Sequence, residues 1–224
     1  MMEQHIVKIL SIENVTHDVK RFRTERPENY NFTSGQATEV AVNKPGFQNE
    51  TRPFTFTGLN DWNYLEFTIK IYPDHNGVTR KLSELVPGDS LIIHDVWGTI
   101  DYKGPGTFIA GGAGITPFIS IFRNLKSRNE LWGNRLIFAN KTKADIILEE
   151  EFKKLLGKCF INILSDEESN DYVHGYITCD FLKANQSKES KFYYLCGPPP
   201  MMSAVEDILK ELKIDEKLII KEGI

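Results

Sequence analysis

The chain changes its pattern once, at residues 102–106, and this change constrains its fold more than any other feature. Before it, short β-branched and aromatic runs alternate with turn residues such as Pro87-Gly88-Asp89, which is typical of a barrel or a sandwich. After Lys103-Gly104-Pro105-Gly106, short apolar runs alternate with segments of helical periodicity. Strands that alternate with helices form a parallel sheet covered on both faces. The 224-residue chain is therefore expected to form two domains, residues 1–103 and residues 104–224.

Each half divides into expected elements. In the first half we expect strands at Ile6–Ile12, Val19–Thr24, Ala37–Val42, Phe54–Thr57, Tyr64–Tyr72 and Leu91–Val96, and a short helix at Arg80–Leu85. In the second half we expect strands at Thr107–Ala110, Arg135–Ala139, Cys159–Leu164, Phe192–Cys196 and Lys217–Ile220. The expected helices of this half are Pro117–Leu125, Asp145–Leu156 (with Asp145 as its N-terminal cap), Tyr176–Leu182 and Met201–Leu212. The right-handed crossover rule makes this second sheet doubly wound.

Composition excludes several classes of function. With 27 basic and 31 acidic side chains the formal net charge is −4, which argues against a nucleic-acid-binding protein. No apolar run reaches the roughly 18 residues of a membrane span, and the first residues lack the pattern of a signal peptide. The three cysteines contain no C-x-x-C pair, so neither a disulfide framework nor a zinc or iron–sulfur site is evident, and the five histidines show no metal-ligand spacing. We therefore expect a cytoplasmic globular protein without a metal.

A glycine-rich segment, Gly111-Gly112-Ala113-Gly114-Ile115-Thr116-Pro117, joins an expected strand to an expected helix. Glycines let the backbone pass close to a phosphate or a flat ring, and a helix N-terminus offers free N–H groups to an anion. Pro117 suits the first turn of a helix. The segment lacks the spaced G-x-G-x-x-G of a dinucleotide fingerprint, so a tight turn without a ligand is the alternative interpretation.

A second segment, Cys196-Gly197-Pro198-Pro199-Pro200-Met201, also follows a strand and precedes a helix. Ligands of open α/β sheets bind at the carboxyl ends of the strands, where Gly197 and the prolines would form a rigid, open rim. Cys196 would stand at the strand tip, although a buried structural cysteine is the alternative interpretation.

A third segment, Arg52-Pro53-Phe54-Thr55, lies in the first half. Arginine can clamp a phosphate with two hydrogen bonds. Phe54 can cover a flat ring, and the Thr55 hydroxyl can donate a hydrogen bond. Taken alone, the four residues fit an ordinary strand with a surface arginine better than they fit a binding site.

In this order the three segments resemble the ferredoxin–NADP reductase superfamily over nearly the whole chain, and most closely its small bacterial members without a fused ferredoxin domain. The resemblance implies a six-stranded antiparallel β-barrel that binds FAD, followed by a doubly wound α/β domain that binds a nicotinamide nucleotide. It implies that Arg52 holds the FAD pyrophosphate, Phe54 packs on the flavin and Thr55 lies near flavin N5. Phe54 replaces the family's usual tyrosine, which removes one hydroxyl group.

The resemblance implies further binding residues. In the barrel these are Ile69, Lys70, Ile71 and Tyr72, whose backbone would contact the flavin, and the helix start Gly77-Val78-Thr79, which would meet the pyrophosphate. In the second domain the nicotinamide would contact Gly111, Gly112, Gly114, Thr116, Cys196, Gly197, Pro198 and Met201. Cys196 would face the nicotinamide. Glu222 is expected as an acidic neighbour of Cys196 and Thr55, or else as a solvated residue of the tail.

The choice of nucleotide depends on the end of the second sheet strand. There Asn140, Lys141 and Lys143 are expected to bind the nucleotide, and the two lysines could hold the 2′-phosphate of NADPH. Asp145 follows and could serve only as a helix cap, and the lysines could equally form a solvated surface. NADPH is therefore the expected donor, with NADH as the alternative.

The sequence as a whole predicts an FAD enzyme that takes a hydride from NAD(P)H. Because the chain carries no cluster-binding cysteines, its electrons are expected to pass singly to a separate carrier such as ferredoxin or flavodoxin. Such carriers are usually acidic, and the basic residues that could meet one are Lys20, Arg21, Arg23 and Arg26, although an ordinary exposed strand explains these residues at least as well. A flavin reductase or an oxygenase's reductase component is the alternative enzyme, and a non-catalytic flavin or nucleotide sensor is the alternative of another class. We expect a monomer or a weak dimer.

Overall fold

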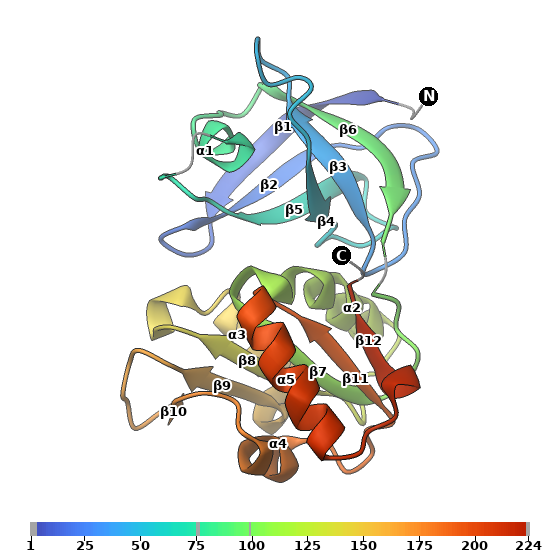
Figure 1. Cartoon of the computed structure of the whole chain (residues 1–224). Coiled ribbons are helices and arrows are strands. Elements are labelled where there is room, and N and C mark those ends of the chain that lie inside the picture. The colour runs from blue at the N-terminus through green and yellow to red at the C-terminus, as the bar shows by residue number, and fades with distance from the viewer. Residues whose placement is uncertain (1–3, 75–76, 99, 223–224) are drawn as a thin grey trace.

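The computed structural model describes residues 4–74, 77–98 and 100–222. It contains two domains, one above the other in Figure 1, with an all-strand domain at the N-terminal end of the chain and an α/β domain after it. The last strand of the first domain ends at Trp97, and the first strand of the second domain begins at Gly106.

The first domain is a six-stranded antiparallel barrel. Its strands are β1 (His5–Asn14), β2 (Val19–Glu25), β3 (Ala37–Val42), β4 (Arg52–Thr55), β5 (Tyr64–Lys70) and β6 (Ser90–Trp97), in the order β4-β3-β6-β1-β2-β5. Phe56 forms an antiparallel bridge with Phe67, and Thr57 N donates to Glu66 O at 2.8 Å, which joins the two outer strands. All six expected strands are confirmed.

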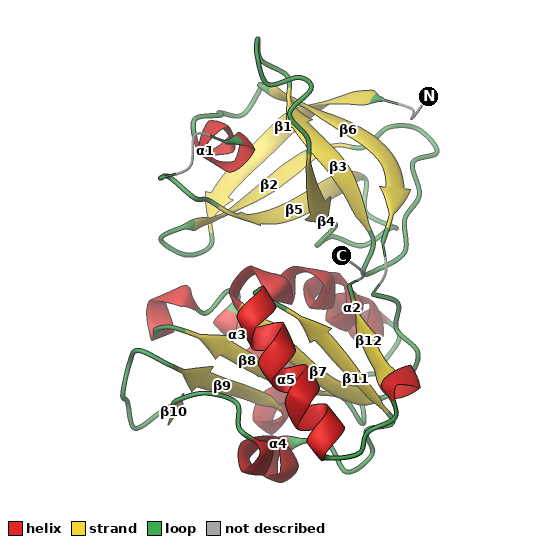
Figure 2. Ribbon diagram, viewed as in Figure 1, coloured by secondary structure: helices red, strands yellow, loops and turns green. Residues whose placement is uncertain are grey.

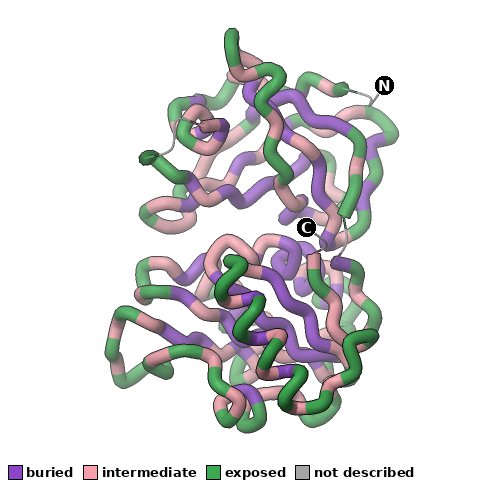
Figure 3. The backbone as a smooth tube through the Cα atoms, in the orientation of Figure 1, coloured by how far each residue is buried: buried purple, intermediate pink, exposed green. Residues whose placement is uncertain are grey.

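The barrel interior follows from the alternation of its strands. Phe22, Phe56 and Phe67 are completely buried in it, together with aliphatic side chains from β1, β3, β5 and β6. One helix, α1 (Val78–Ser83), covers an end of the barrel with Val78 and Leu82. This helix begins two residues earlier than expected, and Gly77 is its N-cap. Figure 3 shows the buried strand segments inside each domain.

The second domain is a six-stranded parallel sheet with helices on both faces (Figure 2). Its strands, in the order β10-β9-β8-β7-β11-β12, are β7 (Gly106–Gly111), β8 (Arg135–Asn140), β9 (Phe160–Leu164), β10 (Val173–His174), β11 (Phe192–Cys196) and β12 (Ile219–Lys221). Its α-helices are α2 (Thr116–Ser127), α3 (Glu149–Leu156), α4 (Cys179–Asn185) and α5 (Pro199–Glu211). Short 3₁₀ turns occupy Gly112–Ile115, Lys143–Asp145, Gly157–Cys159 and Glu216–Leu218. The two-residue β10 was not expected, because so short a strand carries no alternation.

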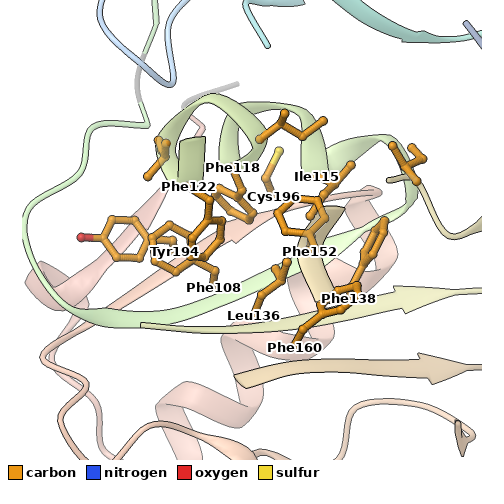
Figure 4. Close-up of a cluster of buried hydrophobic side chains, with 14 of the residues drawn as sticks. Phe108, Ile115, Phe118, Phe122, Leu136, Phe138, Phe152, Phe160, Tyr194 and Cys196 are labelled. Atoms are coloured by element: carbon orange, nitrogen blue, oxygen red, sulfur yellow. The ribbon is translucent and has the colours of Figure 1, made fainter. Parts of the chain in front are cut away.

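The core of this domain is rich in aromatic residues between the sheet and the helices α2 and α3 (Figure 4). The Phe108 ring stacks on Tyr194 with centroids 4.1 Å apart and meets Phe122 at 4.6 Å. On the opposite face, Ile109, Ile137 and Leu195 pack with α5. Such alternation along neighbouring strands is what a sheet covered on both faces requires.

Two helices of the second domain begin three or more residues later than predicted. The helix expected at Asp145–Leu156 begins at Glu149, because Leu148 adopts a left-handed conformation (φ 54°) that interrupts it. Asp145 does not cap that helix: it belongs to a separate 3₁₀ turn, where it forms a capping box with Thr142.

The helix expected at Tyr176–Leu182 begins at Cys179 and extends to Asn185. The Thr178 hydroxyl accepts a hydrogen bond from Phe181 N at 3.1 Å and so fixes this start.

Across the described residues, no helix is both long and apolar enough to span a membrane.

Candidate active site: a cleft between the two domains

A cavity of about 450 Å³ lies between the barrel and the carboxyl ends of β7 and β11. Residues that the three sequence segments supply from both domains line it. This is the position at which open α/β sheets bind ligands. The fold therefore brings together segments as far apart in the chain as Pro53 and Glu222.

The barrel wall of the cleft consists of side chains from β4 and β5 and from the residues that follow them. The predicted residues that line it are Pro53, Phe54, Thr55, Ile69, Lys70, Tyr72 and Thr79. Phe54 lines the cavity and also packs against the barrel core, so its ring is held in place. Thr55 pairs in register with Ala37 of β3, another residue of the lining.

The opposite wall is made of two loops that press against each other. Gly111, Gly114, Thr116, Cys196, Gly197 and Pro198 line it as expected. A Cβ on Gly114 would stand 2.3 Å from Cys196 O, and one on Gly111 would stand 2.5 Å from Met201 Sδ. Real Cβ atoms do not approach other atoms this closely, so the glycines are needed for the contact between the loops. The two loops predicted separately thus form a single surface.

Cys196 and Glu222 form a polar contact in this wall. The thiol Sγ donates to Glu222 Oε2 at 3.9 Å, and Glu222 lines the same cavity as Thr55. Burial and then the negative charge of Glu222 raise the pKa of the Cys196 thiol to about 12. The thiol is therefore neutral at physiological pH. Cys196 also belongs to the apolar core cluster (Figure 4), so it is both buried and part of the lining.

A second cavity of about 270 Å³ extends the cleft over the α/β domain. It shares Lys70, Tyr72, Gly111, Ala113 and Pro198 with the first cavity, so the two are continuous. The predicted residues Gly112, Asn140, Lys141 and Met201 line it. Ser165, Tyr176 and Ile177 also line it; they come from the irregular segment after β9, where no local pattern identified them.

Asn140 is an unusual member of this lining. Its side chain is nine-tenths buried, and within the described part of the chain neither its amide nitrogen nor its amide oxygen has a hydrogen-bond partner. Buried polar groups are normally paired, and an unpaired one lowers stability by about 1–3 kcal/mol. An amide kept in this state at the edge of a cavity fits a site whose ligand is polar.

Five predicted binding residues lie outside both cavity linings. Ile71 and Val78 are buried in the barrel core, and Gly77 caps α1. Arg52 is exposed on β4, where its Nη1 donates to Thr51 O at 2.6 Å. Lys143 places its ammonium 5.7 Å from the centre of the Tyr172 ring. Pro199 of the predicted proline rim lines the first cavity, whereas Ala37 and Thr68 line it but were not predicted.

The basic residues expected to meet a carrier protein are engaged within the barrel. Lys20 Nζ donates to Ser83 O at 2.9 Å, and Arg21 pairs with Glu13 at 2.9 Å. Arg23 pairs with Glu66 at 3.1 Å, and Arg26 donates to three backbone carbonyl groups. Each of these four charged groups therefore already has a partner within the barrel.

Comparison with known proteins identifies the two domains. Residues 6–102 match the family model "Oxidoreductase FAD-binding domain", and residues 108–207 match "Oxidoreductase NAD-binding domain". NADH-cytochrome b5 reductase 1 of Aspergillus terreus is 30% identical over 89% of this chain and 74% of that protein. The chain belongs to the ferredoxin–NADP reductase superfamily. It is an NAD(P)H-dependent flavoprotein oxidoreductase, as the sequence predicted.

Other relatives share the same arrangement. NADH-cytochrome b5 reductase 1 of Rattus norvegicus is 28% identical over 96% of this chain and 84% of that protein. A human Ncb5or structure in its NAD⁺ form has a TM-score of 0.83 at 25% identity, covering 99% of this chain and 70% of that one. A ferredoxin NADP⁺ reductase from Neisseria gonorrhoeae, solved with FAD and NADP, has a TM-score of 0.83 at 19% identity over 97% of each chain. The last comparison shows the fold alone.

The cleft fits the two cofactors that the family binds. The glycines let the two loops of the α/β wall pack on each other, and the first loop leads into the start of α2, whose free N–H groups can meet an anionic group. The Asn140 amide offers unused hydrogen-bond capacity, and Lys141 adds a positive charge beside it. The barrel wall contributes an aromatic face and hydroxyl groups. The residues present are therefore suited to FAD on the barrel side and a nicotinamide nucleotide on the α/β side.

Proposed function

We propose that this protein oxidises NADPH and passes the electrons one at a time to a separate small carrier protein. The continuous cleft carries this proposal, because it places the flavin segment and the two nucleotide loops on facing walls. When bound, FAD supplies the chemistry of accepting a hydride and releasing single electrons. The cysteines Cys159, Cys179 and Cys196 lie on separate elements, so an iron–sulfur carrier would be another protein.

On the barrel wall, Phe54 and Thr55 would hold the flavin ring system. Phe54 offers an apolar face that the barrel core keeps in place, and the Thr55 hydroxyl offers a hydrogen bond near the reacting edge. Backbone groups of residues 69–72 would complete this contact. Arg52 and the start of α1 at Gly77–Thr79 would bind the pyrophosphate, and the exposed guanidinium of Arg52 is free to turn toward it.

On the α/β wall, the loops at Gly111–Thr116 and Cys196–Pro198 would hold the nicotinamide. The Cys196 thiol keeps its proton and donates a hydrogen bond to Glu222, so it acts as a neutral, polarisable contact and not as a nucleophile. Cys196, Glu222 and Thr55 line one cavity, which is where the two reacting rings would meet. Holding both rings at reactive distance is the main contribution of the protein to such a transfer.

The second cavity supports NADPH as the preferred donor. A carboxylate in this position commonly binds the ribose 2′-hydroxyl of NADH, whereas a basic group accommodates a 2′-phosphate. Asp145 lines the cavity, but its Oδ2 already accepts from Thr142 N and Oγ1, both at 2.8 Å. Lys141 lines the same cavity and would meet the phosphate.

The carrier is the remaining part of the proposal. Several relatives are named NADH-cytochrome b5 reductases, which supports a small one-electron carrier of the cytochrome b5 kind. Ferredoxin and flavodoxin, expected from the sequence, belong to the same functional class.

A steady-state assay with NADPH and, separately, cytochrome b5, ferredoxin, flavodoxin or free FMN as acceptor tests the proposal. We expect rapid turnover with one of the three proteins. Turnover with free FMN but with none of the proteins would contradict it and indicate a flavin reductase.

A further inference from the structure

The helix α2 connects the cleft to the barrel along one of its faces. Thr116, Ser120 and Arg123 are spaced by four and three residues, so their side chains lie on the same side of the helix. Thr116 lines the cleft, and Ser120 Oγ accepts a hydrogen bond from Gly35 N of the barrel at 3.1 Å. Figure 1 shows α2 on the side of the α/β domain that faces the barrel.

Arg123 makes the most extensive of these contacts. Its Nη1 donates to Glu66 Oε1 at 2.6 Å and to Thr57 O at 2.7 Å, both in the barrel. Its Nε and Nη2 donate to the two carboxylate oxygens of Glu151 in α3 at 2.5 and 2.8 Å. One planar guanidinium thus binds the barrel with one edge and its own domain with another, which a flexible lysine ammonium could not reproduce.

Glu66 is the matching group on the barrel side. It is completely buried on β5, and its second oxygen accepts from Arg23 Nε at 3.1 Å. Burial alone would raise the pKa of Glu66, but the charges and hydrogen bonds of Arg123 and Arg23 hold that pKa below its usual value. The carboxylate therefore keeps its charge, and each of its oxygens binds a guanidinium.

The pair also connects to the barrel wall of the cleft. Thr57 Oγ1 donates to Glu66 Oε1 at 3.1 Å and lies 3.2 Å from Thr68 Oγ1. Thr68 lines the first cavity. On the helix side, Thr116 precedes Arg123 by seven residues, which is about two turns or ~10 Å along α2. The ion pair therefore lies behind the cleft and is joined to a lining residue of each wall.

We propose that Arg123 and Glu66 are positioning residues for the reaction, which fix the two walls of the cleft at the separation that hydride transfer requires. Neither residue lines either cavity, so both act through Thr68 and the start of α2. A reacting pair displaced by 1 Å can lose about a hundredfold in rate. The inference rests on the proposed placement of flavin and nicotinamide on opposite walls.

The test compares Arg123→Met, Arg123→Lys and Glu66→Gln with the unmodified holoprotein in anaerobic stopped-flow reduction by NADPH. We expect the limiting reduction rate to fall by up to about 100-fold in Arg123→Met. Arg123→Lys restores part of the rate because it keeps a cation beside Glu66. FAD content and the apparent Kd for NADPH stay within about threefold, and the long-wavelength absorbance of the nicotinamide–flavin complex decreases. Arg128→Met, at an exposed pair with Glu130 just beyond the same helix, is the control and keeps the rate.

Several results would overturn the inference. One is a limiting rate in folded Arg123→Met equal to that of the unmodified protein. Another is a loss that appears only as lower FAD content or weaker NADPH binding, since that indicates a structural role alone. If Arg123→Met does not fold, Glu66→Gln, which has the same shape without the charge, decides by the same two criteria. An unmodified protein that NADPH does not reduce would instead contradict the proposed function.

Discussion

The two walls of the cleft are built by different means. The barrel wall consists of side chains on strands, chiefly Phe54, Thr55 and Lys70. The α/β wall is formed mainly by two loops rich in glycine and proline, together with Thr116, Cys196 and Glu222. A wall of side chains can adapt when one of them is changed, whereas a wall of closely packed backbone cannot. This difference fits a cofactor that stays on the barrel and a nucleotide that must enter and leave against a rigid surface.

The largest effect is expected from a methyl group added to the backbone wall. In Gly114→Ala the new Cβ would stand 2.3 Å from Cys196 O and 2.6 Å from Gly197 N, so one loop has to move. We expect the limiting rate of flavin reduction to fall by about 100-fold or more. Gly157→Ala is the control: no atom of the described chain lies within 4 Å of its Cβ position, so its positive φ (53°) strains the backbone without a collision, whereas Gly114 collides without a positive φ. Equal rates in Gly114→Ala and the unmodified protein would show that this wall is adaptable.

A change on β4 just beside the side-chain wall tests the other half of the comparison. Arg52→Met removes the guanidinium proposed to bind the FAD pyrophosphate, while the exposed position should leave the fold intact. A hydrogen bond to a charged group contributes about 1.5–3 kcal/mol, so the Kd for FAD is expected to rise by about 10- to 150-fold. Fluorescence titration of the apoprotein with FAD measures this. An unchanged Kd would remove Arg52 from the site.

A smaller effect is expected where the nucleotide meets a side chain of the α/β domain. Lys141→Gln should raise the KM for NADPH by about tenfold and leave the KM for NADH unchanged, because only NADPH carries the 2′-phosphate. Lys143→Gln is the informative comparison, since that ammonium lies over the Tyr172 ring. We expect it to change the KM for NADPH clearly less. Equal effects of the two substitutions, or a loss with NADH as well, would contradict the assignment of Lys141.

The smallest effect concerns the pH dependence of the α/β wall. The pKa of Cys196 is raised to about 12, so the thiol stays protonated below that pH and no thiolate forms between pH 7 and 9. Iodoacetamide followed by mass spectrometry should therefore label Cys196 much more slowly than the partly exposed Cys159 and Cys179 at pH 8.5. Glu222→Gln removes the negative charge that helps to raise this pKa, so labelling of Cys196 becomes faster. Labelling of Cys196 as fast as that of the other two would show a reactive thiolate.

The features that could be predicted from the sequence are those that depend on residues close together in the chain. Alternation located the six barrel strands, and the glycine-rich and proline-rich loops were recognisable because backbone geometry restricts the residues there. The interruption at Leu148 was not predictable, because a leucine in the left-handed conformation has no compositional signal. Ser165 and Tyr176 were missed for a similar reason: they reach the cavity from an irregular segment.

The contacts between the two domains could not be predicted from the sequence either. Arg123 and Glu66 are 57 positions apart and look like ordinary charged residues of a helix and a strand. Only the fold shows that their pair is buried. The same limit applies to the basic residues of β2. Arg23 pairs with Glu66, and Lys20 donates to the carbonyl group of Ser83; neither partner could be recognised from the sequence.

The most direct test of the whole account is the visible spectrum of the purified protein under anaerobic conditions, titrated first with NADPH and, in a separate sample, with NADH. We expect the flavin absorbance to bleach promptly, and we expect NADPH to be effective at a lower concentration than NADH. A protein that holds FAD but is not reduced by either nucleotide would be a sensor and not a reductase. A colourless protein that cannot be reconstituted with FAD would show that the cleft does not bind a flavin opposite a nicotinamide.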